Sequence, residues 1–154
     1  MIFEHIFDLT SNQKQSLFDI WNAEYPEKLA YQNISEFEEY LSKLNSATHF
    51  LLYDDNQEIK GWACTFDRES ERWFLIILSH EIQKKGYGKQ LLDILKEHET
   101  HLSGWVIDHN QDRKSNNEYY FSPLDFYKKS GFLVTDIKLK TEKISAIKII
   151  WNKS

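Results

Sequence analysis

The spacing of hydrophobic residues changes along the chain, and each change predicts a new structural element. Residues 2–9 alternate apolar and polar side chains, which is the period of a strand with one buried face. Apolar residues then recur at helical spacing from Leu17 to Trp21, behind a capping box over Thr10–Gln13. Pro26 cannot continue a helix, so this first helix is expected to end before it.

A second helix and three strands follow in the pattern. Ser35 and Glu38 form a second capping box, and the apolar residues from Phe37 to Leu44 mark one face of a helix. The period then returns to that of a strand, and the last of the three segments is apolar on both faces, as a central strand should be. The expected strands cover residues 48–53, 59–66 and 73–79.

The second half of the chain alternates helices with strands. Leu91–Leu95 carries the inner face of a helix that follows a pair of glycines. Ser122 as N-cap, Pro123 as first helical residue and Gly131 after the last turn mark a short helix. Strands are expected over residues 102–108, 132–140 and 144–152. The order β-α-α-β-β-β-α-β-α-β-β mixes hairpins with helical connections, so it predicts one α/β or α+β domain over residues 1–154, with a mixed sheet.

Composition and charge narrow the class of protein. Hydrophobic residues make up 41% of the 154 residues and charged residues 28%, which is ordinary for a soluble globular domain. The net charge of -5 argues against nucleic acid as a partner. Aromatic residues reach 15%, more than a core usually needs, so we expect some of the five tryptophans to line a pocket.

The compartment is expected to be the cytoplasm. The N-terminus lacks the basic and apolar regions of a signal peptide, and no apolar run approaches the roughly 20 residues of a membrane span. Cys64 is the lone cysteine and lies in an apolar alternation, which predicts a buried thiol in a reducing compartment. No membrane partner is expected.

The turn before the third expected helix combines several features of an anion site. A fully apolar strand runs into this turn, which contains Gly86 and Gly88. The first N–H groups of a helix have no partner within it and carry a partial positive charge, while glycine lets a ligand approach the backbone closely. Lys84, Lys85 and Lys89 add positive charge. We therefore expect phosphate groups of a ligand to bind here.

Two common phosphate-binding motifs fit this turn poorly. A P-loop requires four residues between its glycines and a Ser or Thr after the lysine, where this chain has Gln90. A dinucleotide fingerprint requires a third glycine at Leu91, although Asp108 lies about 20 residues further on, as that motif requires. A nucleotide-binding domain that does not use CoA therefore stays an alternative, as does a solvated basic turn without a ligand.

A third motif fits better. Gln83–Gly88, with the sequence QKKGYG, matches the Gln/Arg-x-x-Gly-x-Gly/Ala signature of the GNAT superfamily of acyl-CoA N-acyltransferases. Residues 126–132, FYKKSGF, resemble the aromatic-Tyr-x-x-x-Gly-Phe segment that follows the fifth strand in this superfamily. The expected order of helices and strands is also that of the superfamily. The chain thus resembles a GNAT N-acyltransferase over nearly its whole length.

This resemblance implies a fold, a cosubstrate and a reaction. The fold would be a mixed sheet of about seven strands with four helices, whose fourth and fifth strands splay apart to hold acetyl-CoA. The protein, a monomer or homodimer, would transfer the acetyl group by direct attack of a primary amine from a small-molecule or peptide acceptor. The residues implied in CoA binding are Ile76, Ile77, Leu78, Gln83, Lys84, Lys85, Gly86, Tyr87, Gly88, Lys89 and, by its place after the fifth strand, Asn110.

Acyl transfer requires a neutral amine, a stabilised oxyanion and a proton for the leaving thiolate. By the resemblance, Tyr127 occupies the general-acid position, and a backbone N–H near Leu78 could serve the oxyanion. His80 and Asp108 stand at strand ends near the expected site and are candidates for the base. Proton removal through water without a dedicated base stays open. The histidines show no metal-ligand spacing, so no metal is expected.

The acceptor pocket is expected to involve the first two helices and their connection. Its candidate residues are Trp21, Glu24, Tyr25, Arg68 and Tyr120. Trp21 also stands at core spacing, so a purely structural role is the stronger interpretation for it. A function of another class stays open beside the enzyme: a catalytically silent protein of the same fold that binds acyl-CoA and regulates a partner.

Overall fold

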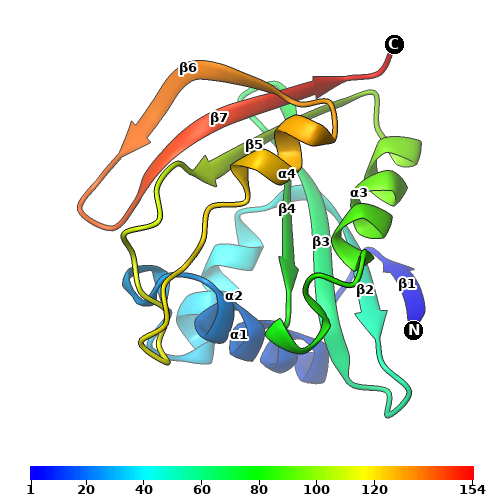
Figure 1. The fold of residues 1–154 in the computed structure, drawn as a ribbon. Helices are drawn as coiled ribbons and strands as arrows, with labels where there is room; N and C mark the ends of the chain where they lie inside the picture. Colours follow the sequence, from blue (N-terminus) through cyan, green and yellow to red (C-terminus); the bar gives the residue numbers. More distant parts are fainter.

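Seven strands of one sheet run through the centre of the protein in the computed structural model, which describes all of residues 1–154 (Figure 1). The strands are β1 (Ile2–Ile6), β2 (Asn45–Tyr53), β3 (Ile59–Arg68), β4 (Glu71–Leu78), β5 (His101–Ile107), β6 (Leu133–Lys140) and β7 (Ser145–Asn152). The helices are α1 (Ser11–Glu24), α2 (Ile34–Ser42), α3 (Tyr87–His98) and α4 (Leu124–Lys129). The predicted order is confirmed, and the sequence pattern missed two short 3-10 turns, η1 (Glu27–Leu29) and η2 (His80–Ile82).

The sheet, with strand order β1-β2-β3-β4-β5-β7-β6, is divided between β4 and β5. β3 pairs with β4 along all of β4, and β5 pairs with β7 in the same antiparallel manner. Between the parallel strands β4 and β5, Trp73 and Ser103 are the one registered pair. The two strands diverge beyond it (Figure 1). The predicted mixed sheet with splayed fourth and fifth strands is confirmed, and the side of β4 that faces β5 has no strand partner after Trp73.

Helices cover both faces of the sheet. α1 and α2 pack on one face, where Leu17, Trp62 and Cys64 are fully buried in one hydrophobic cluster. α3 and α4 pack on the other face, where a second cluster contains Leu91 and Ala63. Neighbouring residues of a strand point to opposite faces, which is why consecutive residues of β3 belong to different clusters. None of the helices is long and apolar enough to cross a membrane.

Helix caps show where local sequence reasoning succeeds and fails. The predicted capping box of α1 is confirmed: Thr10 Oγ1 accepts a hydrogen bond from the Gln13 N–H, and Gln13 Oε1 accepts one from the Thr10 N–H. The predicted Ser35 cap of α2 is wrong. Asn33 caps this helix, and its side chain accepts from the Glu36 N–H at 3.0 Å. Asparagine suits an N-cap as well as serine, so the helix extends to the earlier of the two residues.

The start of α4 is one residue later than predicted. Pro123 occupies the N-cap and the helix begins at Leu124. The Ser122 hydroxyl still accepts from the Leu124 N–H at 3.3 Å, so this serine helps to start the helix from one residue further away. Gly131 has a φ of +92°, the left-handed conformation predicted for the residue after the helix.

Candidate functional site

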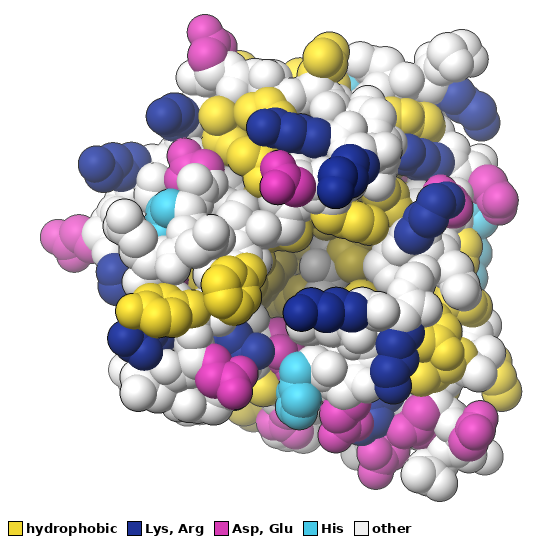
Figure 2. Space-filling model, viewed as in Figure 1, with side chains coloured by type: hydrophobic (Ala, Val, Ile, Leu, Met, Phe, Trp, Pro, Cys, Tyr) yellow, Lys and Arg dark blue, Asp and Glu magenta, His cyan; other side chains and the backbone are white.

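The divided part of the sheet encloses a cavity of about 230 Å³. Figure 2 shows a hollow lined by hydrophobic side chains between α4 and the turn that precedes α3. Both diverging strands and helices from both faces of the sheet contribute to the lining. The lining residues are Trp21, Tyr25, Leu29, Tyr40, Phe66, Arg68, Trp73, Phe74, Leu75, Ile76, Trp105, Val106, Ile107, Tyr120, Pro123, Tyr127 and Ile144.

Four tyrosines present hydroxyl groups to this cavity: Tyr25, Tyr40, Tyr120 and Tyr127. None of these hydroxyls is hydrogen-bonded within the chain, yet no buried polar side-chain atom lacks a partner. Each hydroxyl must therefore reach accessible surface, and the cavity is the surface that all four residues line. Burial raises the pKa of all four phenols, so they are uncharged hydrogen-bond donors at neutral pH.

Tyr127 combines a buried ring with an accessible hydroxyl. Its ring packs edge-on against Phe74 and Phe132, with centroid distances of 5.6 and 5.4 Å. Burial is the main cause of its raised pKa, and the neighbouring Tyr120 adds to it. The ring is therefore part of the core, while the hydroxyl is accessible from the cavity.

Arg68 is the one charged residue that lines the cavity. Its guanidinium carbon lies 4.9 Å from the ring centroid of Phe66 and 5.4 Å from that of Trp73. Both are cation–π distances, so the aromatic rings attract the guanidinium and help to hold it at the cavity wall. No hydrogen bond or ion pair connects this guanidinium to the rest of the protein.

The glycine turn leaves the N-terminus of α3 without a side-chain cap. Gly86 is the N-cap residue, and its φ of +89° is the left-handed conformation that favours glycine. Lys84 and Lys85 are exposed and form no ion pair, whereas Lys89 pairs with Asp93 at 2.9 Å. Uncapped N–H groups beside unpaired lysines are the features that a phosphate-binding turn needs.

Glu24 lies outside the cavity, in a buried polar cluster beside it. Its carboxylate accepts hydrogen bonds from the backbone N–H of His80 at 2.7 Å and from Lys114 Nζ at 3.0 Å, and it lies 2.9 Å from His80 Nδ1. Because a carboxylate can only accept, Nδ1 carries a hydrogen, and in the neutral imidazole Nε2 of His80 is then the proton acceptor. The cluster ties the end of α1 to η2 and to the long loop before α4.

The predicted residues differ in whether they line the cavity. Ile77, Leu78, Gln83 and Tyr87 do not: Ile77 is buried in the cluster under α1 and α2, and Gln83 Nε2 donates to the Leu78 carbonyl at 2.9 Å. Those that line the cavity are Trp21, Tyr25, Arg68, Ile76, Tyr120 and Tyr127. Asp108 and Asn110 do not line it, and both bind within the chain. Asp108 Oδ1 accepts from Ser145 Oγ at 3.2 Å, and Asn110 Oδ1 accepts from the Ser122 N–H at 2.7 Å. These two residues hold the ends of the loop between β5 and α4.

Sequence reasoning missed several aromatic residues of the cavity. Trp73 and Trp105 lie on the two diverging strands with ring centroids 5.4 Å apart, and Tyr40 projects from α2. The high aromatic content predicted a lined pocket without identifying its residues. If the fourth and fifth strands are expected to splay, residues of these two strands that point to the same face of the sheet are candidates to line the gap. This reasoning could have identified Trp73 and Trp105.

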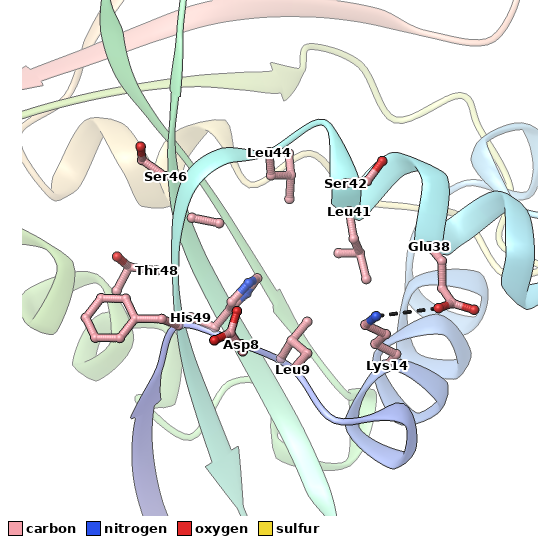
Figure 3. A pocket seen from close by; sticks show the side chains of 12 residues that line it. Asp8, Leu9, Lys14, Glu38, Leu41, Ser42, Leu44, Ser46, Thr48 and His49 are labelled. Carbon is pink, nitrogen blue, oxygen red and sulfur yellow. Dashed lines mark hydrogen bonds and ion pairs between the residues drawn. The ribbon is translucent and has the colours of Figure 1, made fainter.

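A second, more open hollow of about 630 Å³ lies between the start of α1, the end of α2 and β2 (Figure 3). The ion pair between Lys14 and Glu38, at 3.5 Å, lies on its wall. His49 also lines it, with Nδ1 accepting from Trp62 Nε1 at 3.1 Å. None of the residues predicted for the site reaches this hollow, so its larger size does not make it the candidate site.

Comparison with known families gives one match that covers most of the chain. The acetyltransferase (GNAT) domain family matches residues 10–152. No curated protein sequence gives a significant match.

Solved structures that share the fold include several acetyltransferases. An aminoglycoside 6'-N-acetyltransferase complexed with coenzyme A has a TM-score of 0.73 and 15% identity, over 99% of this chain and 97% of that one. A phosphinothricin acetyltransferase from Sinorhizobium meliloti in complex with AcCoA has a TM-score of 0.68 and 16% identity, over 99% and 89%. The ribosomal-protein-S18-alanine N-acetyltransferase from Escherichia coli has a TM-score of 0.66 and 16% identity, over 99% and 95%. At these identities the similarity concerns the fold.

Proposed function

Because this chain belongs to the GNAT acetyltransferase family, we propose that it transfers the acetyl group of acetyl-CoA to a primary amine, which attacks the thioester directly in the cavity between β4 and β5. The observation that carries this proposal is the divided sheet. β4 has an edge without a strand partner beside a cavity that is lined by four tyrosines with accessible hydroxyls, and the uncapped N-terminus of α3 follows β4 in the chain.

The residues around the split fit an acyl-CoA. The edge of Ile76–Leu78 has no strand partner and offers backbone groups to the amides of the pantetheine arm, since such groups need partners when they are buried. The Leu78 carbonyl is the exception, because it accepts from Gln83 Nε2 at 2.9 Å. The N–H groups of Gly86–Lys89 would hold the pyrophosphate, and the unpaired Lys84 and Lys85 would add attraction. A backbone N–H near Leu78 would stabilise the oxyanion that forms as the amine attacks.

Tyr127 is the proposed general acid for the leaving thiolate. Burial raises its pKa, which keeps the proton on the phenol at every pH where the enzyme works. The same shift makes full proton transfer to a thiolate unfavourable, since an ordinary thiol has a pKa of about 8.5. Tyr127 would therefore act mainly through a hydrogen bond that strengthens while the C–S bond breaks.

His80 is the better supported of the two candidates for the base. Glu24 holds its Nδ1 hydrogen, which presents Nε2 as a proton acceptor at the end of β4. Asp108 stands at the end of β5, where it binds Ser145. The proposal gives His80 the proton of the attacking amine, and Asp108 remains the second candidate for the same step.

A screen of amine acceptors with detection of free CoA thiol tests this function. Once an acceptor is found, Tyr127→Phe should lower kcat about 100-fold, because it removes only the hydroxyl. CoA affinity and melting temperature should stay close to wild type, because the ring keeps its packing. Tyr119→Phe is a matched control, since the Tyr119 hydroxyl binds Arg113 on the exposed loop.

Two outcomes would contradict parts of the proposal. Full turnover of Tyr127→Phe would remove this tyrosine from the mechanism. CoA binding without thiol release from any amine would identify a silent acyl-CoA-binding protein of the same fold instead of an enzyme. Direct CoA binding is measured separately, as the rise in melting temperature that a ligand of the folded state produces.

A further inference from the structure

We propose that the amine acceptor is a small apolar or aromatic molecule that carries a carboxylate, and that Arg68 binds this carboxylate inside the cavity. The acetylation of such a molecule rests on the proposed function. The carboxylate site itself rests on the lining of the cavity.

Arg68 gives the cavity its one formal charge. The other lining residues are aromatic, aliphatic or proline, and no Asp, Glu, Lys or His is among them. The tyrosines are neutral, because burial raises the pKa of each hydroxyl that faces the cavity. An acidic group on a ligand therefore finds a positive partner here, whereas a polycation finds no carboxylate to bind it.

Three acidic residues lie near Arg68 in sequence, and none of them pairs with it. Glu69 is exposed on the hairpin turn and forms no ion pair. Glu71 stands opposite Arg68 in the ladder between β3 and β4, but its carboxylate accepts from Lys148 Nζ at 2.6 Å. Asp67 pairs with Arg72 at 3.1 Å. The guanidinium of Arg68 thus has no acceptor within the protein, although a half-buried charge is stabilised by one.

The geometry around Arg68 suits a carboxylate. The guanidinium carbon lies over the rings of Phe66 and Trp73, and no hydrogen bond within the protein occupies its N–H groups. The planar guanidinium of arginine binds a carboxylate through two parallel hydrogen bonds, and charge-assisted bonds of this kind are stronger than neutral ones. Arg68 would thereby fix the orientation of the acceptor as well as its position.

The size and charge of the cavity limit the rest of the acceptor. Its volume of about 230 Å³ is below the range of about 300–1,000 Å³ that is typical of drug-sized ligands. Trp21, Trp73 and Trp105 supply apolar walls. The positive charge of Arg68 also opposes a nearby ammonium and favours the neutral amine, which is the form that can attack the thioester.

A binding experiment tests the carboxylate site without turnover. With CoA present, 3-phenylpropionate and its amide are titrated while tryptophan fluorescence is recorded, because the two probes differ in charge and hardly in shape. The acid should bind about 10- to 100-fold more tightly than the amide. Arg68→Gln should abolish this preference and Arg68→Lys should retain part of it. Arg113→Gln, which removes a cation stacked on Tyr119 at 4.2 Å, should leave it unchanged.

The result that overturns the inference is equal or absent binding of the acid and the amide by the wild-type protein. The CoA-induced rise in melting temperature of Arg68→Gln must match wild type, which shows that the variant is folded. A variant that fails this check is replaced by Arg68→Lys, whose intermediate preference carries the same information.

Turnover then separates this inference from the proposed function. With acetyl-CoA, L-phenylalanine should show at least about 10-fold higher kcat/KM than phenethylamine, and Arg68→Gln should remove the difference. Acid-selective binding without thiol release from any amine would support the Arg68 site and overturn the enzyme. Thiol release that favours phenethylamine would support the enzyme and overturn the carboxylate.

Discussion

Gly86 and Gly88 differ in what a methyl group would meet. At Gly86 a Cβ atom would contact nothing within 4 Å, but the φ of +89° strains any L side chain. At Gly88 a Cβ atom would lie 3.5 Å from Leu78 Cδ1, which is an ordinary contact, and φ is not positive. The fold therefore favours glycine at residue 86, whereas at residue 88, inside α3, neither φ nor a close contact requires glycine, and the proposed cofactor would.

We expect Gly88→Ala to change stability and binding in opposite directions. Alanine in a helix should raise the free energy of unfolding by up to about 1 kcal/mol, while its methyl group should weaken CoA binding by holding the pyrophosphate away from the backbone. Urea unfolding and CoA titration measure the two effects. Gly86→Ala should instead lose about 1–2 kcal/mol of stability because of its left-handed backbone. Unchanged CoA affinity in Gly88→Ala would leave this glycine without a role in phosphate binding.

His49 should make stability depend on pH on the acidic side of neutrality. Burial lowers its pKa from 6.5 to about 4, and its Nδ1 accepts a hydrogen bond from Trp62 that protonation of Nδ1 would break. Between these two pKa values the unfolded chain binds a proton that the folded protein does not. The contribution of neutral His49 to stability is therefore complete above pH 6.5. As the pH falls toward 4 it is lost, and the free energy of unfolding decreases by up to about 1.4 kcal/mol per pH unit.

Urea unfolding of His49→Gln between pH 4 and pH 7 checks this expectation. The glutamine oxygen can still accept from Trp62, so the variant should fold and show a flatter pH profile than wild type. His98→Gln, on the exposed side of α3, is the matched control and should keep the wild-type profile. Parallel profiles for His49→Gln and wild type would show that His49 is not the group that titrates.

Among the elements, β4, β5 and β7 meet in a polar cluster at the closed end of the split. Glu71 of β4 accepts from Ser103 Oγ of β5 at 2.9 Å and from Lys148 Nζ of β7 at 2.6 Å. His101 Nε2 lies 2.7 Å from the same Ser103 oxygen. The hydrogen bond from Lys148 is the largest cause that lowers the pKa of Glu71. This cluster fixes the strands next to their one registered pair, Trp73 with Ser103.

We expect Glu71→Gln to impair catalysis more than stability. The amide keeps the shape of the side chain but loses the charge that binds Lys148, so the angle between β4 and β5 is less firmly held. Misplacement of reacting groups by about 1 Å costs on the order of 100-fold in rate, so kcat should fall at least about 10-fold while the melting temperature falls by a few degrees. Glu69→Gln, on the exposed hairpin turn, is the control. Equal kcat values for Glu71→Gln and Glu69→Gln would show that the polar cluster does not control the geometry of the site.

How far the sequence predicts each element depends on how local its cause is. The capping box over Thr10–Gln13 and the strand alternations depend on neighbouring residues, and both were predicted correctly. The start of α2 was missed because Asn33 and Ser35 are both good caps. The contact of Glu24 with Lys114 joins residues far apart in the chain, so no local pattern shows it. The glycine turn before α3 was predictable from its sequence, and its role in cofactor binding stays a prediction, whereas the cavity tryptophans required knowledge of how the sheet divides.

For the whole molecule, four buried phenols should limit stability at alkaline pH. Burial raises the pKa of Tyr25, Tyr40, Tyr120 and Tyr127 above the ordinary value of 10.0. Above pH 10 the unfolded chain loses protons that the folded protein keeps, so stability falls as pH rises. Each of these phenols should lower the free energy of unfolding by about 1.4 kcal/mol for each pH unit above 10. In Tyr40→Phe, urea unfolding at pH 9, 10 and 11 should show a slope shallower by about that amount. The same slope in Tyr40→Phe as in the control Tyr119→Phe would contradict this.

The single registered pair between β4 and β5 also has a mechanical consequence. β4 continues from this pivot at Trp73 to Leu78, a lever of about 17 Å at 3.3 Å per residue. A rotation of about 5° at the pivot would carry the far end about 1.4 Å, and that end holds the backbone proposed to contact the acetyl group. Small substitutions around the pivot are thus amplified where chemistry is sensitive to them. Substitutions in the packing near Glu71, away from the cavity, would therefore change the reaction even when every residue of the cavity stays the same.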